Sequence, residues 1–375
     1  MSVVFGIINK SKKKVSVDEI ETFLNTYSHI PADYVETFID DNFAFGFMGI
    51  DILTEGYLER QPLISEDKRF ICAFRARIDN RKDIFNQLGI TSKESEEISD
   101  AALILKSFFK WGNSCFDRFA GDFAGIIWDR YEKRLIAARD YNGHYPLYYS
   151  EYKDKIYFAS TIRGLLGFPF IDRTPDIPAI LSFALRNDIN SEDSTYKYIK
   201  QFEKRKVYWI DRNGIKKEDY VDYSRFKLIS YNKDIDYYEH AGHLFREIVS
   251  NCLSTKGKTG GFLSGGLDSS SVNVTASEIL SNIGQRLYSY SSVPLYHDVI
   301  VEYKSTFSDE SPYIDEIIKM HPNIIHQYVR CEDYGPVDAL FTDLNENMSF
   351  TCNSQNAYWI YKIYELAHLD NINVL

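Results

Sequence analysis

The sequence has few cysteines, no long apolar segment and no leader-like start, and each absence excludes a class of protein. Its 375 residues include only five cysteines, which are scattered and form no C-x-x-C pair, so the pattern indicates neither a zinc site nor a disulfide framework. No apolar run approaches the roughly 18 residues that a membrane span requires. The N-terminus lacks a basic segment followed by an apolar core and a cleavage site. We therefore expect a cytoplasmic protein that does not enter a membrane.

Positive charge is also scarce. The formal net charge is −11, and the longest basic run is Lys12 to Lys14, so nucleic acid is not expected as a partner. Hydrophobic residues make up 44% of the chain and aromatic residues 15%, which is enough for packed cores and argues against disorder. Because 375 residues exceed what one hydrophobic core usually serves, we expect two domains.

The first half of the chain is rich in predicted strands. Apolar, aromatic and branched residues dominate several short segments, and turn residues separate them. Fewer segments show helical spacing, and one of these has Ser99 and Asp100 as its predicted cap. This half therefore predicts an α+β domain. The expected strands include 3–8, 43–53, 70–78, 119–129, 134–139, 146–150, 156–160, 207–210 and 214–220, and the expected helices 17–27, 83–88, 99–111 and 172–186.

The second half alternates helices and strands. It predicts helices at 237–252, 268–280, 308–320 and 354–368, and strands before Leu263 and at 287–293, 324–329 and from Asn373. Such alternation is typical of a doubly wound parallel sheet with helices on both faces. Ligands of these sheets bind beyond the carboxyl ends of the strands. We place the boundary between the two halves in the irregular stretch 222–234.

The stretch from Gly260 to Ser271 combines a short apolar strand, a turn at Gly265 and Gly266, and a helix that opens at Asp268. Paired glycines let the backbone approach a ligand closely, and the start of a helix presents unpaired amides and a positive dipole. Together these features predict a phosphate receptor. A Walker loop is excluded because Cys252 stands at its first glycine, and no dinucleotide fingerprint is present.

The motif S-G-G-L-D-S-S at residues 264–270 resembles the pyrophosphate loop of the asparagine synthetase superfamily of ATP pyrophosphatases. The resemblance implies that backbone amides of the loop hold the ATP phosphates, that Asp268 binds Mg²⁺, and that Ser292 meets adenine through its backbone. The alternatives are a glycine turn without a ligand and an Asp268 that only caps the helix. The implied ATP-binding residues are Leu263, Ser264, Gly265, Gly266, Leu267, Asp268, Ser269, Ser270 and Ser292.

The first half resembles the glutaminase half of asparagine synthetases. The segments 119–124, 128–129, 138–140, 146–149 and 158–160, together with Gly143, follow the order seen in that half. The resemblance implies a four-layer fold of the N-terminal-nucleophile hydrolase type. It also implies a domain organisation with a glutaminase-like domain at 1–221 and an ATP pyrophosphatase domain at 235–375.

The glutaminase chemistry is missing from the matching positions. Such an enzyme uses an N-terminal Cys as its nucleophile, and Phe5 stands in that slot. Ser2 is the only conceivable substitute, and it lies outside the slot. The residues implied to bind glutamine are also replaced, by Arg75-Ala76-Arg77 and by Gly49. Asp100 matches the acid that meets the glutamine ammonium, although we expect it to cap a helix. We predict an inactive glutaminase.

These resemblances imply an AMP- and pyrophosphate-forming synthetase that uses ATP and Mg²⁺. A carboxylate substrate, either a peptide or a small amino acid, is adenylated and then captured by an amine. Without a glutaminase, the amine is expected from ammonia or from the substrate itself. The latter is the pattern of β-lactam synthetases and of lasso-peptide macrolactam cyclases, which act on a precursor peptide with biosynthetic partner proteins. The runs 77–81, 308–312 and 321–323 resemble the cyclases.

Two further readings remain open at the level of sequence. One is an asparagine synthetase that uses ammonia. The other is a non-catalytic protein that binds nucleotide or a partner, because the family's second magnesium-binding loop would follow the strand that begins at Asn373. We thus expect either a fragment of a longer enzyme or a truncated product. Asp309 and Glu310 either bind substrate or only charge a helix start, and we expect the second. His297, His321 and His326 lack ligand spacing and are expected in loops or at the surface.

Overall fold

The computed structural model describes residues 2–11, 13–50, 60–91, 98–185, 192–253, 257–296, 309–349 and 354–375. Contacts divide the chain into two compact units: among the described residues, the first comprises those up to Lys227 together with 347–349, and the second comprises Leu228–Glu346 and 354–375. The predicted ends of a strand at Leu53 and of a helix at Arg186 lie outside the described residues, as do Ser308 and His297.

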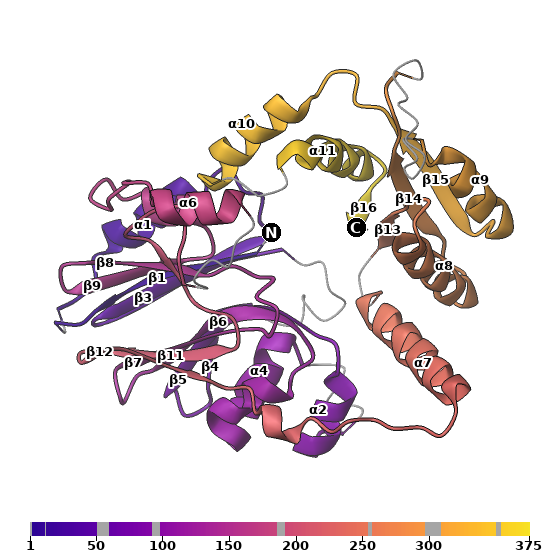
Figure 1. Cartoon of the computed structure of the whole chain (residues 1–375). Helices are drawn as coiled ribbons and strands as arrows, with labels where there is room; N and C mark the ends of the chain where they lie inside the picture. Colours follow the sequence, from indigo (N-terminus) through magenta and orange to yellow (C-terminus); the bar gives the residue numbers. More distant parts are fainter. Residues whose placement is uncertain are drawn as a thin grey trace. The chain divides into compact units, whose positions relative to one another are not determined.

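The first unit contains two six-stranded sheets, whose paired strands all run antiparallel. The strand order is β10-β8-β9-β1-β3-β2 in the first sheet and β12-β11-β7-β6-β5-β4 in the second (Figure 1). In the first sheet the strands are β1 (Val3–Asn9), β2 (Tyr34–Asp40), β3 (Phe43–Gly49), β8 (Tyr148–Tyr152), β9 (Lys155–Ala159) and β10 (Lys200–Gln201). In the second they are β4 (Leu63–Ile64), β5 (Phe70–Ile78), β6 (Gly121–Asp129), β7 (Arg134–Arg139), β11 (Lys206–Asp211) and β12 (Gly214–Asp219).

Helices cover the outer face of each sheet, which gives four layers. Helices α1 (Val17–Thr26) and α5 (Ile162–Leu166) pack on the first sheet through a core that contains Phe5, and α2 (Arg81–Leu88) and α4 (Asp100–Trp111) pack on the second. A third core, which contains Trp128, lies between the sheets. Strand β1 is buried along its whole length because both of its faces are covered, as its unbroken apolar run predicts. The predicted four-layer α+β fold is confirmed.

Some local predictions differ from the structure. Strand β2 was not predicted, because it lies at a sheet edge and most of its side chains are exposed. Helix α6 (Ile177–Ala184) begins five residues after the predicted start at Asp172, and Asp176 caps it by accepting a hydrogen bond from the Ala179 amide. Helix α10 (Pro336–Asn347) in the second unit was also missed.

The second unit is built on a parallel sheet with the order β15-β14-β13-β16. Its strands are β13 (Lys258–Phe262), β14 (Leu287–Ser292), β15 (Ile324–Val329) and β16 (Ile372–Val374). Leu287 packs toward α7 (Asp234–Cys252) and α8 (Leu267–Asn282), whereas Tyr290 packs toward α11 (Ser354–Leu369) on the opposite face. Figure 1 shows α11 on one side of the sheet, with α8 and α9 (Ser311–Met320) on the other. The predicted doubly wound parallel sheet is confirmed.

Helix α7 is present as predicted, but most of its apolar face is exposed. Of the four apolar residues predicted to share that face, only Val249 is buried. Leu244, Phe245 and Ile248 are 48%, 37% and 51% exposed.

None of the helices in the described part of the chain is long and apolar enough to cross a membrane.

Candidate nucleotide site

The loop that follows β13 lies at the topological switch point of the parallel sheet. Strand β13 comes first in the chain, and its neighbours are β14 on one side and β16 on the other. Helix α8, which follows β13, lies on one face of the sheet, whereas α11, which leads into β16, lies on the other. The chain therefore reverses its direction across the sheet between β13 and β16, and a crevice opens there at the carboxyl ends of the strands. The turn from Leu263 to Gly266 occupies this position, where the sequence predicts a ligand.

Close packing around β13 requires its glycines. A Cβ atom on Gly261 would lie 2.4 Å from Oδ1 of Asn273, and one on Gly260 would lie 2.5 Å from a methyl carbon of Leu375. Asn273 is buried in α8 and donates hydrogen bonds to the carbonyl oxygens of Phe262 (2.9 Å) and Ser269 (2.8 Å). One amide side chain thereby joins the end of the strand to the first turn of the helix.

Two serines give the turn its shape. The Ser264 amide donates to Oγ of Ser269 at 3.0 Å, and the two hydroxyl oxygens lie 2.5 Å apart. The Gly266 amide donates to Oγ of Ser264 at 3.3 Å. The Ser270 amide and hydroxyl both donate to the Gly266 carbonyl within α8, at 3.3 Å and 2.7 Å. These contacts use the amides of Ser264, Gly266 and Ser270 inside the protein, so we leave them out of the proposed phosphate-binding set.

The first turn of α8 has backbone amides without a partner inside the helix. Gly266 is the N-cap residue and no side chain caps the helix, so the amides of Leu267, Asp268 and Ser269 have no intrahelical partner. The carboxylate of Asp268 is exposed in this turn, and it makes no hydrogen bond or ion pair with another described residue. The Asp268 side chain therefore does not cap the helix, and its role as a metal ligand stays a prediction.

Glu310 also lies at this loop, although the sequence favoured a place for it at a helix start only. Its Oε2 atom accepts a hydrogen bond from the Gly265 amide at 2.8 Å. The start of α9 is held by Asp309, whose Oδ1 accepts the Ser311 amide at 3.0 Å. The expectation that both acids only charge a helix start is correct for Asp309 and wrong for Glu310. Sequence could not reveal this contact because it joins residues 45 positions apart.

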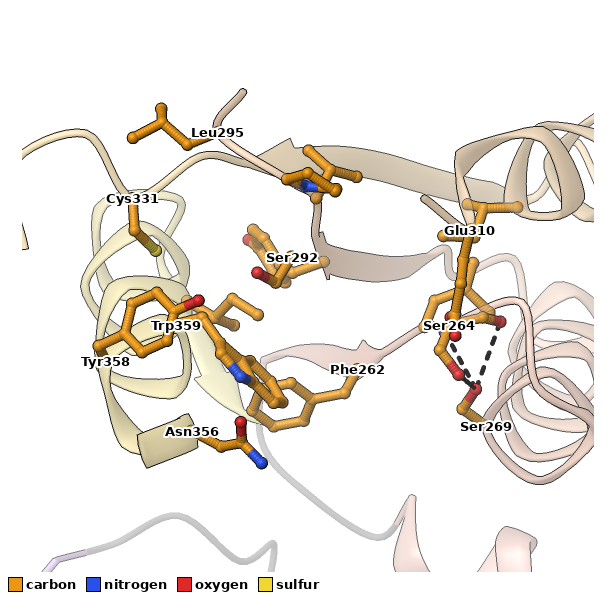
Figure 2. Close-up of a pocket in the computed structure, with 16 residues that line it drawn as sticks. Phe262, Ser264, Ser269, Ser292, Leu295, Glu310, Cys331, Asn356, Tyr358 and Trp359 are labelled. Carbon is orange, nitrogen blue, oxygen red and sulfur yellow. Dashed lines mark hydrogen bonds between the residues drawn. The ribbon is translucent and has the colours of Figure 1, made fainter. Parts of the chain in front are cut away.

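A pocket of about 640 Å³ opens beside the loop, within the second unit. Figure 2 shows Ser264, Ser269 and Glu310 at one end, Ser292 between, and Phe262, Tyr358 and Trp359 at the other. Ser292, which the resemblance implies for an adenine contact, ends β14 and lines the pocket together with Val293. A concave site of this size, apolar at one end and polar at the other, suits a small ligand with a charged group.

No histidine is among the described residues that line the pocket. His326 lies half-buried on β15 and contacts Oγ of Ser289 through Nδ1 at 2.7 Å, so its expected place in a loop was wrong. Burial lowers the pKa of His326 to about 4. His321 follows the end of α9, as expected. Burial raises the pKa of the Cys331 thiol, which lines the pocket. Neither group is poised for acid-base chemistry near neutral pH.

Packed side chains fill the position that the resemblance implies for a nucleophile. Phe5 is fully buried in the middle of β1, where it pairs with Gly46 and Ala159 on the two neighbouring strands. A Cβ atom on Gly46 would lie 2.4 Å from the Phe5 ring, whose centroid is 5.1 Å from that of Phe23. The Ser2 hydroxyl accepts a hydrogen bond from the Ile50 amide. No described hydroxyl or thiol thus replaces the nucleophile in this slot.

The positions implied to bind glutamine are occupied as well. The Arg75 guanidinium lies 3.8 Å from the ring centroid of Tyr145, and Arg77 pairs with Asp79 at 2.8 Å and with Asp122 at 3.2 Å. A Cβ atom on Gly49 would lie 2.2 Å from the ring of Tyr34, which fills the space of a larger side chain.

Asp100 is engaged by the protein itself. Its carboxylate forms an ion pair with Arg81 and accepts a hydrogen bond from the Ile78 amide at 3.1 Å. The helix cap expected of Asp100 is instead made by Ser99, whose hydroxyl accepts the Ala102 amide. An ammonium group would have to displace a guanidinium to reach Asp100.

One cluster with metal-ligand chemistry lies in the first unit. Ligand atoms of Asp122, Asp140 and His144 lie within 4.8 Å of one another. However, Oδ1 of Asp140 accepts backbone amides of the turn at Asn142 and Gly143, and Asp122 pairs with Arg77. These contacts are those of a turn and an ion pair, and we assign no metal there.

Comparison with known proteins finds a different family in each half of the chain. A glutamine amidotransferase domain family matches residues 1–221, and an asparagine synthase family matches residues 240–375. The chain is 25% identical over 280 residues to the glutamine-hydrolysing asparagine synthetase 3 of Bacillus subtilis, an alignment that covers 72% of this chain and 44% of the relative. It is also 25% identical over 279 residues to asparagine synthetase 1 of that organism, covering 73% and 43%.

The chain therefore spans less than half the length of these two curated relatives. Among solved structures, the glutamine phosphoribosylpyrophosphate amidotransferase of B. subtilis, in complex with ADP and GMP, aligns with 13% identity and a TM-score of 0.45, covering 88% of this chain and 91% of the other. The two family matches together cover nearly the whole sequence, and the chain belongs to the asparagine synthetase superfamily.

Proposed function

We propose that this protein is an ATP-dependent synthetase that adenylates a carboxylate, releases pyrophosphate and forms an amide without hydrolysing glutamine. The observation that carries the proposal is the uncapped first turn of α8, at the switch point of a parallel sheet and beside a pocket of about 640 Å³. A helix N-terminus with unpaired amides favours phosphate.

The residues of the loop fit ATP and Mg²⁺. The amides of Leu267, Asp268 and Ser269 are the proposed donors to the phosphates, and the strand ends at Leu263 and Ser292 are the proposed neighbours of adenine. The exposed carboxylate of Asp268 would be repelled by a triphosphate unless a cation lay between them, so it is the proposed ligand of Mg²⁺. The bound ion would offset negative charge on the pyrophosphate leaving group.

The proposed reaction has two steps. An oxygen of the substrate carboxylate attacks the α-phosphorus, the bond to the bridging oxygen breaks, and pyrophosphate leaves. The α8 dipole and its amides stabilise the charge that develops on pyrophosphate, because they are fixed before the reaction begins. An amine then attacks the acyl-adenylate, which yields the amide and AMP. The aromatic end of the pocket, at Phe262 and Trp359, offers apolar contact to a ligand.

The proposed amine is ammonia or a group of the substrate itself, because packed side chains fill the glutaminase slot at Phe5. Capture by the substrate's own amine would make the protein a macrolactam cyclase of the lasso-peptide type, acting on a precursor peptide. A second candidate is an asparagine synthetase that uses ammonia: the names of the relatives favour asparagine synthesis, and the filled slot at Phe5 favours ammonia over glutamine. The third reading is a protein that binds nucleotide without turnover.

Pyrophosphate release separates these candidates. We would measure it with aspartate and ammonia, with aspartate and glutamine, and with a precursor peptide. Release with the peptide alone supports the cyclase, and release with aspartate and ammonia alone supports the second candidate. Release with glutamine would contradict the inactive glutaminase. A binding measurement with Mg-ATP comes first, and we expect Asp268→Ala to lose binding at least tenfold. An undiminished affinity would remove Asp268 from the site.

A further inference from the structure

The carboxylate of Glu310 accepts a hydrogen bond from an amide of the loop that is proposed to bind phosphate. Its Oε2 atom lies 2.8 Å from the Gly265 nitrogen, and it caps nothing in its own helix. The approach is close, because a Cβ atom on Gly265 would lie 3.2 Å from Cβ of Glu310 and 3.1 Å from Cβ of Tyr313. A negatively charged group of the protein therefore stands where the turn offers an N–H to an anion.

Phosphate and this carboxylate compete for the same donor. One backbone N–H makes one strong hydrogen bond, so a phosphate oxygen that reaches Gly265 must displace Glu310. The displaced carboxylate would remain beside the phosphate, and like charges a few ångströms apart repel strongly unless a cation lies between them. Glu310 is exposed, so water can solvate it once it leaves, and the displacement costs little desolvation energy.

We infer that Glu310 is an exchangeable occupant of the anion site: it holds the Gly265 amide in the absence of nucleotide, yields it to a phosphate oxygen, and makes phosphate binding depend on a divalent cation. The inference rests on the proposed function of the loop. In the empty site the carboxylate satisfies an amide and keeps the turn in shape. In the filled site its charge raises the requirement for magnesium.

The test is calorimetric titration with inorganic pyrophosphate and with ATP, each with and without Mg²⁺. The variant is Glu310→Gln, which removes the charge but keeps a carbonyl oxygen to accept the Gly265 amide. The matched control is Glu316→Gln on the same helix, where the exposed Glu316 carboxylate lies 3.6 Å from Lys319. The control removes the same charge without touching the loop.

In the absence of Mg²⁺, we expect Glu310→Gln to bind pyrophosphate about tenfold more tightly than the unaltered protein, a difference of about 1.4 kcal/mol. The gain in affinity on adding Mg²⁺ should shrink by a similar factor. The control should behave as the unaltered protein does. The signal of the Gly265 amide in ¹⁵N-glycine spectra should move on pyrophosphate addition, and equal melting temperatures would show that the variant is folded.

The outcomes separate the inference from the proposed function. If Glu310→Gln binds pyrophosphate no better than the unaltered protein without Mg²⁺, while both bind Mg-ATP, the exchange is wrong and the proposed function stands. If neither protein binds pyrophosphate or ATP even with Mg²⁺, both are wrong. An equal gain in Glu316→Gln would attribute the effect to overall charge and also overturn the exchange.

Discussion

The two units differ in what has become of their ligand positions. In the first unit, side chains of the protein fill the nucleophile slot and two positions implied to bind glutamine. The Phe5 ring packs over Gly46, the Tyr34 ring packs over Gly49, and Arg81 forms an ion pair with Asp100. In the second unit the first turn of α8 stays uncapped and a pocket lies beside it. The fold is preserved in both units, so preserved architecture by itself says nothing about preserved chemistry.

The physical reason lies in where stability comes from. The four layers of the first unit are held by three apolar cores, and Phe5 at the nucleophile slot belongs to one of them. Phe5 at the nucleophile slot adds buried surface where a catalytic thiol would need access and a free amine. Four predictions test this contrast, and they follow from the largest expected effect to the smallest.

Phe5→Ala should give the largest effect. The ring is fully buried and in contact with Phe23 and Tyr27, so its removal leaves a cavity and lowers the free energy of unfolding by about 3–5 kcal/mol. Chemical denaturation measures the loss, and Mg-ATP affinity below the transition should stay unchanged. A loss below about 1 kcal/mol would show that the slot is not a packed core.

Arg81→Met should come next. Asp100 is buried, so removal of its guanidinium partner leaves a carboxylate that is costly to keep ionised, and we expect a loss of about 3 kcal/mol. The control is Lys10→Met, which breaks a more exposed ion pair with Glu151 and should cost less than about 1 kcal/mol. Equal losses in urea denaturation would contradict the assignment of a buried pair.

Substitutions of Ser269 and Ser270 test which hydroxyl shapes the loop of the second unit. Ser269→Ala removes the hydroxyl that accepts the Ser264 amide, so the turn loosens and Mg-ATP affinity should fall about tenfold, or about 1.4 kcal/mol. Ser270→Ala removes a hydroxyl that bonds only to carbonyls of its own helix, and affinity should change less than twofold. Calorimetry measures both, and a larger effect at Ser270 would contradict the geometry.

Acid should destabilise the second unit before the first. Burial lowers the pKa of His326 to about 4, whereas an unfolded histidine titrates near its ordinary value of about 6.5, so the unfolded state binds the additional proton between these values. The contribution of His326 is therefore complete above about pH 6.5 and is lost as the pH falls toward 4.

The first unit should respond only at lower pH. Burial alone would raise the pKa of Glu19, but hydrogen bonds from Lys155 and Tyr157 lower it overall. Its contribution is thus present above the ordinary carboxyl pKa and is lost as the pH falls below it. Unfolding followed from pH 7 to 4 should show a smaller loss in His326→Asn than in the unaltered protein. An identical slope would contradict the assignment.

Sequence patterns predicted the features that depend on near neighbours. The strand at Phe70–Ile78 and the helix capped by Ser99 follow from apolar periodicity and a capping residue. The turn before α8 follows from paired glycines between an apolar strand and a polar helix start. Strand β2 was missed because its partly exposed side chains carry little apolar signal.

By itself, the sequence determined the fold class of each half and the place of the glycine turn before α8, because both depend on residue types at known spacing. The phosphate-binding role of that turn and the inactive glutaminase stay predictions. Only the tertiary structure decided which amides of the loop lack a partner within the helix. It also decided that Arg81 forms an ion pair with Asp100 and that the Glu310 carboxylate accepts a hydrogen bond from the Gly265 amide. These contacts join residues 19 and 45 positions apart. Such pairs form only after helices and sheets have packed, and no local pattern encodes them.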